Sequence, residues 1–89
     1  MQFLKYIMLN VEIISIEGFL FQGQAHQVVV PVVSGDIGFM KGHESLVGEL
    51  KEGNISVFDD ADKVIKEIAV KSGTVEMFDG KKLVVLVDA

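Results

Sequence analysis

The chain is a succession of short apolar runs, rich in Val, Ile, Leu and Phe, which glycines and polar turn residues separate from one another. Runs of roughly four to eight residues bounded in this way are typical of β-strands. A surface helix would instead need an apolar residue at roughly every third or fourth position over about 12 residues. Residues 61–70 come closest to that pattern, but their β-branched side chains favour a strand: Val64, Ile65, Ile68 and Val70.

We therefore expect an all-β chain of about eight to ten strands in hairpin order, folded as a small antiparallel β-sandwich with no long helix. Residues 19–32 hold either two strands or one long strand bent at Gly23, and residues 37–40 are a candidate for a further short strand. The remaining strands are expected at 10–16, 45–50, 55–58, 63–70, 73–78 and 81–88.

Turn and breaker residues add detail to this pattern. A glycine inside a strand often marks a bulge, which we expect at Gly23. Pro31 cannot donate a ladder hydrogen bond, so its strand should end there or lie at a sheet edge. Asp79-Gly80 predicts a two-residue hairpin, because both residue types tolerate positive φ angles. The polar residues 59–62 are expected to form another hairpin tip.

The length of 89 residues suits one domain. We assign residues 11–89 to the sandwich and residues 1–10 to an N-terminal extension or an added edge strand, with Met1 and Met8 as alternative starts of translation. Two runs, 28–30 and 83–87, are apolar at every position. A sandwich of this size has only one interior, so we expect part of this apolar surface to face a partner.

Charge and composition argue against several classes of function. Eight basic residues, all of them lysine, stand against 13 acidic ones, and the net charge of −5 argues against nucleic-acid binding. The absence of cysteine excludes disulfides and thiolate nucleophiles. The N-terminus lacks the positive region of a secretory signal, and no run reaches the ~18 apolar residues of a membrane span. Membrane association is therefore expected only through a partner.

The segment GDIGFMKGH, residues 35–43, concentrates glycines and charged side chains in nine positions. Gly35, Gly38 and Gly42 do not follow the spacing of a phosphate-binding loop. We interpret them as the structural glycines of a loop that turns sharply.

The remaining polar residues do not form a recognisable metal or catalytic motif. His26 and His43 lack the spacing of a zinc site, and the acids at 59–62 lack the glycine and glutamate of an EF-hand. We therefore expect no metal, no cofactor and no catalytic residue.

Seven motifs keep an order and spacing that can be compared with known families: VEIISIE (11–17), FQG (21–23), VVVP (28–31), GDIGFMKGH (35–43), LKEG (50–53), VKSGTVE (70–76) and LVVLVD (83–88). Together they resemble the amino-terminal domain of the epsilon subunit of bacterial F-type ATP synthases, called delta in mitochondria. The sequence departs from the family pattern at four places: Val32-Val33, Lys41, Glu44-Ser45 and Thr74.

The resemblance implies a non-catalytic subunit of the central stalk, which links gamma to the membrane c-ring and couples proton flow to ATP synthesis. It implies a peripheral position at the cytoplasmic face of the bacterial inner membrane and no cofactor. It assigns the ring contact to Ser34, Gly35 and Asp36, and the gamma contact to Ser15, His43, Leu46, Val47 and Gly48.

In this family a helical hairpin follows the sandwich and carries inhibition of ATP hydrolysis and, in some members, nucleotide binding. These residues stop at Ala89, where that hairpin would begin, so the resemblance implies neither role for them. Two other classes of function stay open. One is a stand-alone sandwich that binds a small ligand or forms homo-oligomers, and the other is an enzyme using Asp36, His43 and Glu44.

Overall fold

The computed structural model describes residues 8–88, and within that range it contains nine β-strands and no helix. The all-β prediction is confirmed, and the described residues include no helix long and apolar enough to cross a membrane. The strands are β1 (Leu9–Ser15), β2 (Gly18–Ala25), β3 (Gln27–Val32), β4 (Gly35–Met40), β5 (Leu46–Glu49), β6 (Gly53–Phe58), β7 (Val64–Val70), β8 (Gly73–Phe78) and β9 (Lys82–Val87).

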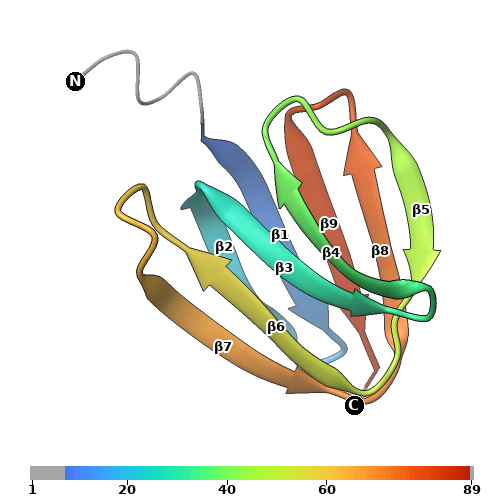
Figure 1. Ribbon diagram of the computed structural model, residues 1–89. Coiled ribbons are helices and arrows are strands. Elements are labelled where there is room, and N and C mark those ends of the chain that lie inside the picture. The colour runs from blue at the N-terminus through green and yellow to red at the C-terminus, as the bar shows by residue number, and fades with distance from the viewer. Residues whose placement is uncertain (1–7, 89) are drawn as a thin grey trace.

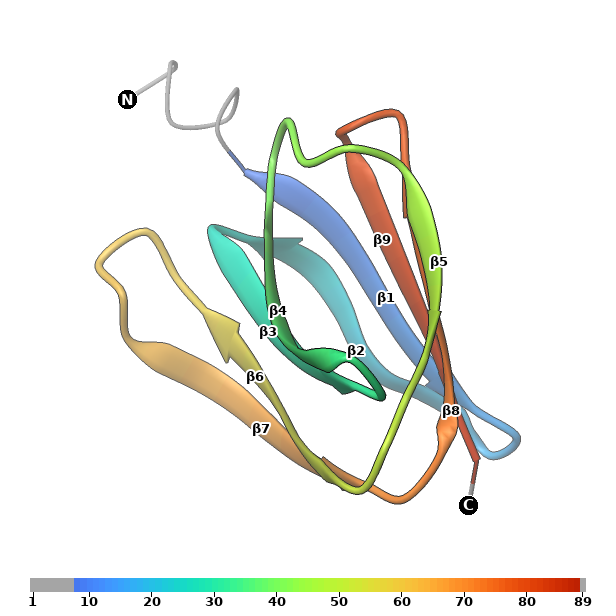
Figure 2. The same cartoon turned by 45° about the vertical axis from the view of Figure 1, so that its right-hand side comes forward.

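The strands form two sheets that pack face to face as a sandwich (Figures 1 and 2). Sheet A has the order β2-β1-β9-β8-β5, and sheet B has the order β4-β3-β6-β7. Named neighbours are antiparallel except β1 and β9, which run parallel with Ile13 opposite Val85. The last strand, β9, thus lies in the middle of sheet A between β1 and β8, and it pairs with the first strand of the described chain.

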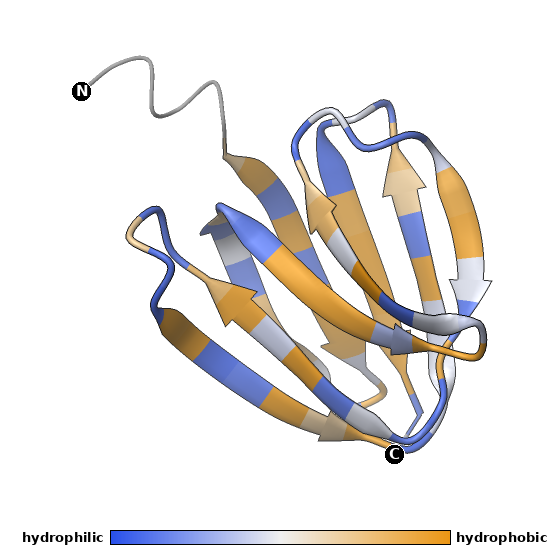
Figure 3. Cartoon of the chain, viewed as in Figure 1, coloured by the Kyte–Doolittle hydropathy of each residue, from blue (hydrophilic) through white to orange (hydrophobic). Residues whose placement is uncertain are grey.

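The inward side chains of both sheets form one apolar core. Along β9, Leu83, Val85 and Val87 are buried, whereas the residues between them face outward, as the two-residue period of a strand requires. Figure 3 shows the hydrophobic bands that run along the strands. Burying one large aliphatic or aromatic side chain contributes about 1.5–3 kcal/mol. The core is therefore the main source of stability in this small domain.

The chain crosses from sheet A to sheet B at His26, so residues 19–32 are not one long strand bent at Gly23. Residues 19–32 thus contain two strands, and Gly23 lies inside β2 opposite Val11. The irregularity in β2 lies elsewhere, because the register shifts between Ile13 and Ile14 and leaves Leu20 as the extra residue. The crossing is held by the His26 amide, which donates to the Phe58 carbonyl at 2.9 Å.

Pro31 neither ends its strand nor lies on an edge strand, so that prediction is wrong. β3 continues to Val32 and lies between β4 and β6. Its pairing with β6 stops at Val29, however, so the proline lies beyond that ladder and interrupts none of its bonds. The Pro31 carbonyl accepts a hydrogen bond from the Lys51 amide at 3.0 Å.

Most of the glycine-rich segment 35–43 is a strand, which corrects its interpretation as a loop. β4 pairs with β3 over its whole length, with Gly38 opposite Val29. Gly35, the first residue of β4, has a φ angle of 127°, and Gly42, in the turn after β4, has a φ angle of 93°, whereas Gly38 has no such angle. A side chain at Gly38 would instead meet the amide of Gln27, whose Nε2 lies 2.5 Å from the position of a Cβ. The absence of a side chain at Gly38 leaves room for the Gln27 side chain on the paired strand β3.

The two predicted hairpin tips are confirmed. Asp79 and Gly80 have φ angles of 52° and 67°, and the Lys81 amide closes the turn on the Phe78 carbonyl at 2.9 Å. Residues 59–63 join β6 to β7. β1 begins at Leu9, and most of the segment predicted as an extension or edge strand, residues 1–10, lies outside the described residues.

Candidate interaction surface

The residues predicted to contact the ring lie together at one end of the sandwich. Ser34 is in the turn between β3 and β4, and Gly35 and Asp36 open β4, where the Asp36 side chain is exposed. The turn is tied to the end of β5, because the Val33 amide donates to the Glu49 carbonyl at 2.9 Å. A rigid hairpin therefore presents the Asp36 carboxylate to any partner that binds at this end of the sandwich.

His43 lies at the opposite end of β4, in the turn that leads to β5. Its ring packs on Phe39 with centroids 4.9 Å apart, and its Nδ1 lies 2.9 Å from the Glu44 carbonyl oxygen. The same turn is tied to the β8–β9 hairpin, because the Gly42 amide donates to the Gly80 carbonyl at 2.8 Å. His43 is thus held as part of a turn, and its ring is only partly exposed.

Ser15 lies at the other end of sheet A from His43. β1 starts beside the β8–β9 hairpin, where the Asn10 amide donates to the Lys81 carbonyl at 3.0 Å, and it ends at Ser15. The Ser15 hydroxyl accepts a hydrogen bond from the Glu17 amide at 3.1 Å and so caps the β1–β2 turn. The structure therefore does not bring Ser15 and His43 together at one point.

The predicted gamma contacts in β5 point in alternate directions. Leu46 packs against the core, and Gly48 also faces inward, where a Cβ would lie 3.3 Å from Val75 Cγ1. Val47 lies between them and is 71% exposed on the outer face of sheet A. Of these three residues, Val47 is the one whose side chain is available to a partner.

The outer face of sheet A carries an apolar strip that the sequence predicted only in part. Ile14 lies directly opposite Phe19 on β2 and opposite Leu86 on β9, and Val84 lies two residues before Leu86 on the same face. Phe19 and Leu86 are 56% and 50% exposed. The run 83–87 signalled an excess of apolar residues, but the part played by Phe19 depends on strand pairing. We call Ile14, Phe19, Val47, Val84 and Leu86 the sheet A strip.

A groove joins Val47 to the rest of the sheet A strip. Val47 and Leu86 both line an open groove of about 600 Å³ on the outer side of β5, β8 and β9. Acidic side chains border and interrupt the strip, because Glu49 lies opposite Thr74 beside Leu86, and Glu76 lies between Val47 and Val84. Glu12 lies opposite Val84 and pairs with Lys82, with Nζ 3.7 Å from Oε2. The strip is thus apolar from Phe19 to Leu86, and acidic side chains lie along its rim and separate Val84 from Val47.

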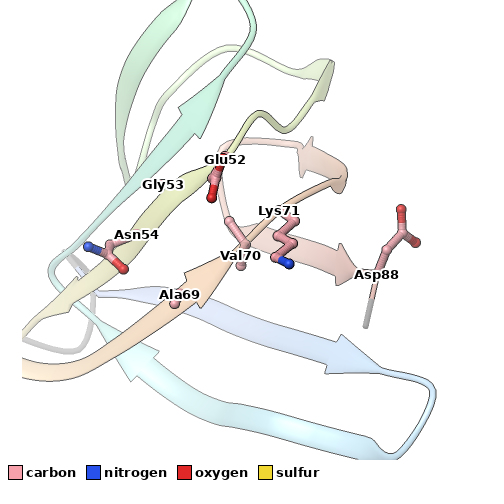
Figure 4. Close-up of a pocket in the computed structure, with 7 residues that line it drawn as sticks. All are labelled: Glu52, Gly53, Asn54, Ala69, Val70, Lys71 and Asp88. Carbon is pink, nitrogen blue, oxygen red and sulfur yellow. The ribbon is translucent and has the colours of Figure 1, made fainter.

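A second depression of about 460 Å³ lies where β6, β7 and the end of the described chain meet (Figure 4). Glu52, Lys71 and Asp88 line it from three different segments. In Figure 4 the Asp88 carboxylate lies on the far side of the depression from Glu52 and points away from the Lys71 side chain, so these three groups do not converge on one point. Within residues 8–88, no group of three or more His, Cys, Asp or Glu side chains could hold a metal ion.

The comparisons with known proteins agree on one family. Residues 8–89 match the model of the ATP synthase delta/epsilon chain β-sandwich domain. The ATP synthase epsilon chain of Campylobacter lari is 35% identical over 74 residues, which are 83% of this chain and 56% of that protein. The epsilon chain of Campylobacter fetus is 36% identical over 80 residues, 90% of this chain and 60% of that protein.

Two solved structures share the fold. A chain of the Euglena gracilis mitochondrial ATP synthase superposes with a TM-score of 0.81 at 17% identity, over 90% of this chain and 50% of that one. A chain of the Tetrahymena thermophila mitochondrial ATP synthase, in a structure of its central stalk and c-ring, gives 0.71 at 10% identity, over 91% and 63%. The chain spans a little over half the length of its epsilon-chain relatives. By the match of residues 8–89, it belongs to the ATP synthase delta/epsilon chain family as the β-sandwich domain of that family.

Proposed function

We propose that this chain is a non-catalytic part of the central stalk of a rotary ATP synthase, where it links gamma to the c-ring and helps to couple proton flow to ATP synthesis. The observation that carries the proposal is the match of residues 8–89 to the delta/epsilon β-sandwich domain. The neighbour from Tetrahymena comes from a structure of a central stalk and c-ring, which supports the same assembly. The position of such a complex would be peripheral, at the cytoplasmic face of a bacterial inner membrane.

The sheet A strip is the surface that we assign to gamma. It is continuous from Phe19 through Ile14 to Leu86, and the groove extends it to Val47. An uncovered apolar surface rimmed by polar residues is typical of a protein-binding face. The acidic rim predicts lysine or arginine side chains on the facing edge of gamma, because complementary charges favour encounter and orientation. The apolar centre would supply most of the affinity, since exposed ion pairs contribute about 0–1 kcal/mol each.

The β3–β4 hairpin is the part that we assign to the ring. Its tip carries Ser34 and the exposed carboxylate of Asp36 on a hairpin that is bonded to β5. A carboxylate held in this way can accept charge-assisted hydrogen bonds from polar or basic groups of the ring loops. The two partners would thus bind different parts of one stiff sandwich, which is what transmission of torque requires.

The alternative is a stand-alone module in which the sheet A strip pairs with a second copy of the chain. A symmetric dimer would cover the same apolar side chains, so the strip alone does not decide between the two partners. The acidic rim disfavours the dimer, because like charges would face each other across the interface. Such an interface would bring Glu49 and Glu76 of one copy close to acidic side chains of the other copy.

Co-purification with the cognate gamma subunit tests the proposal. The chain and gamma are expressed together, and each is also purified alone and mixed. We expect a stable one-to-one complex that excludes self-association of the chain. A homodimer that ignores gamma would overturn the stalk proposal and support the stand-alone module. Turnover of a substrate that disappears in His43→Ala would instead revive an enzymatic function.

A further inference from the structure

The turn between β4 and β5, residues 41–45, carries the chain from sheet B to sheet A and is bonded to the β8–β9 hairpin. The Gly42 amide donates to the Gly80 carbonyl at 2.8 Å. The Asp79 amide donates to the hydroxyl oxygen of Ser45 at 3.1 Å, across 34 positions of sequence. We call Gly42, Ser45, Asp79 and Gly80 the turn clasp, since together they fasten one end of the two sheets.

The two glycines of the turn clasp bring the backbones of the two turns into contact. A Cβ on Gly80 would lie 3.2 Å from the Cα of Gly42, and the φ angles are 67° at Gly80 and 93° at Gly42. Glycine adopts positive φ angles readily and lets another backbone approach closely. The clasp is therefore mainly a contact between backbones, to which Ser45 adds a hydrogen bond from a side chain.

Ser45 lies next to a strand that has few pairing partners. β5 is four residues long and lies at the edge of sheet A, where β8 is its neighbour. The ladder between these strands ends with Leu46 opposite Met77. The hydrogen bond between Ser45 and Asp79 lies just beyond that pair and fastens the same two segments once more. Ser45 therefore anchors the beginning of β5, two residues before the exposed Val47.

We propose that Ser45 is a positioning residue for the binding of gamma, through the hydrogen bond that its hydroxyl group accepts from the Asp79 amide. This inference rests on the proposed function, in which Val47 belongs to the surface for gamma, and on the predicted gamma contact of His43. The two residues flank Ser45, two positions to either side. A surface that is ordered before association loses less conformational entropy when its partner binds. The turn clasp thus holds the backbone on both sides of Ser45 in one arrangement before gamma arrives.

Amide hydrogen exchange of the free chain tests whether Ser45 holds the turn. Ser45→Ala removes the acceptor of the Asp79 amide, whereas Ser45→Thr retains a hydroxyl group at the same position. The decisive probe is the Gly42 amide, because it bonds to Gly80 and not to Ser45. If the clasp opens as a unit, Ser45→Ala should speed the exchange of this amide about 3- to 10-fold. Ser45→Thr should leave the exchange near the rate of the parent chain.

Titration of the same variants with gamma tests whether the ordered turn matters for binding. Ser56→Ala is the matched control, because the Ser56 hydroxyl also joins two segments, donating to Glu67 Oε2 at 3.3 Å in sheet B. One neutral hydrogen bond contributes modestly, so we expect Ser45→Ala to raise the Kd for gamma about 2- to 10-fold. Ser45→Thr and Ser56→Ala should bind gamma nearly as well as the parent chain.

The two measurements together decide the proposal. Unchanged exchange of the Gly42 amide in Ser45→Ala would overturn it, because Ser45 would not hold the turn. Faster exchange with an unchanged Kd, loss of both properties in Ser45→Thr, or equal weakening by Ser56→Ala would overturn it as well. If the parent chain does not bind gamma, the stalk proposal itself fails, and this inference fails with it. Normal binding by the parent chain together with one of the earlier results overturns the role of Ser45 alone.

Discussion

The backbone carbonyl oxygen of Leu86 occupies the space that a side chain on Gly73 would need. Gly73 opens β8 opposite Val87, at a φ of 146° that L-residues rarely adopt. Leu50 Cδ1 closes the other side, 3.1 Å from the position of a Cβ. The close approach of β8 and β9 at this point therefore depends on glycine both for space and for backbone conformation.

Replacement of Gly73 by alanine should lower the free energy of unfolding by about 2 kcal/mol or more, because backbone strain alone costs about 1–3 kcal/mol. Gly38→Ala is the matched control. The atom that it would meet is the end of the flexible Gln27 side chain, which can move aside, so we expect a change within about 1 kcal/mol. Urea unfolding of both variants measures the difference, and equal losses would show that the two glycines are equivalent.

Substitution of Leu86 by aspartate should weaken gamma binding while leaving the sandwich folded. Leu86 is half exposed at the centre of the sheet A strip, and a charge there would be desolvated against an apolar partner. Loss of a central anchor costs about 2 kcal/mol, which is roughly a 30-fold rise in Kd. Ile65→Asp makes a comparable change at a similarly exposed site on β7, in the other sheet.

Titration of gamma with the two variants separates these sites. Leu86→Asp should bind much more weakly than the parent chain, and Ile65→Asp should bind nearly as well. The reverse order would place gamma on sheet B and remove the assignment of the sheet A strip.

Reversal of charge at Asp36 should impair proton-driven ATP synthesis more than it impairs folding. The side chain is exposed at the end of the sandwich, so Asp36→Arg disturbs no core packing but would repel basic groups on the ring loops. Asp60→Arg makes the same change in the β6–β7 loop, at the other end of β6 and away from the proposed ring contact. ATP synthesis in membrane vesicles and melting temperature are measured for both variants. A loss of coupling in proportion to a loss of stability, or an equal loss in Asp60→Arg, would contradict the assignment.

Local pattern was enough to predict the strands and several turns. β8 lies at the predicted residues 73–78, and Asp79-Gly80 forms the predicted hairpin, because both features depend on neighbours in sequence. The parallel pairing of β1 with β9 was not predicted, since hairpin order says nothing about strands far apart in the chain. The crossing at His26 was also missed, because it uses neither glycine nor proline.

The candidate surface was harder to predict for the same reason. The apolar run 83–87 indicated that some residues must face outward, but Phe19 joins them only through the shifted register between β1 and β2. The glycine-rich segment was interpreted as a loop and is mostly a strand. Gly38 leaves room for the Gln27 side chain on the paired strand, and no local pattern reveals that proximity. The contacts assigned to gamma and the ring stay predictions that need the partners themselves.

Site-directed cross-linking in the assembled complex tests the linking role most directly. The chain contains no cysteine, so one introduced thiol is unique within it. Asp36→Cys and Val47→Cys each receive a short thiol-reactive cross-linker, with Asp60→Cys as the control for non-specific capture. We expect Asp36→Cys to yield a product with the ring subunit, Val47→Cys to yield one with gamma, and Asp60→Cys to yield none with the ring. Capture of a single common partner by both test positions, or of no ATP synthase subunit by either, would contradict the account.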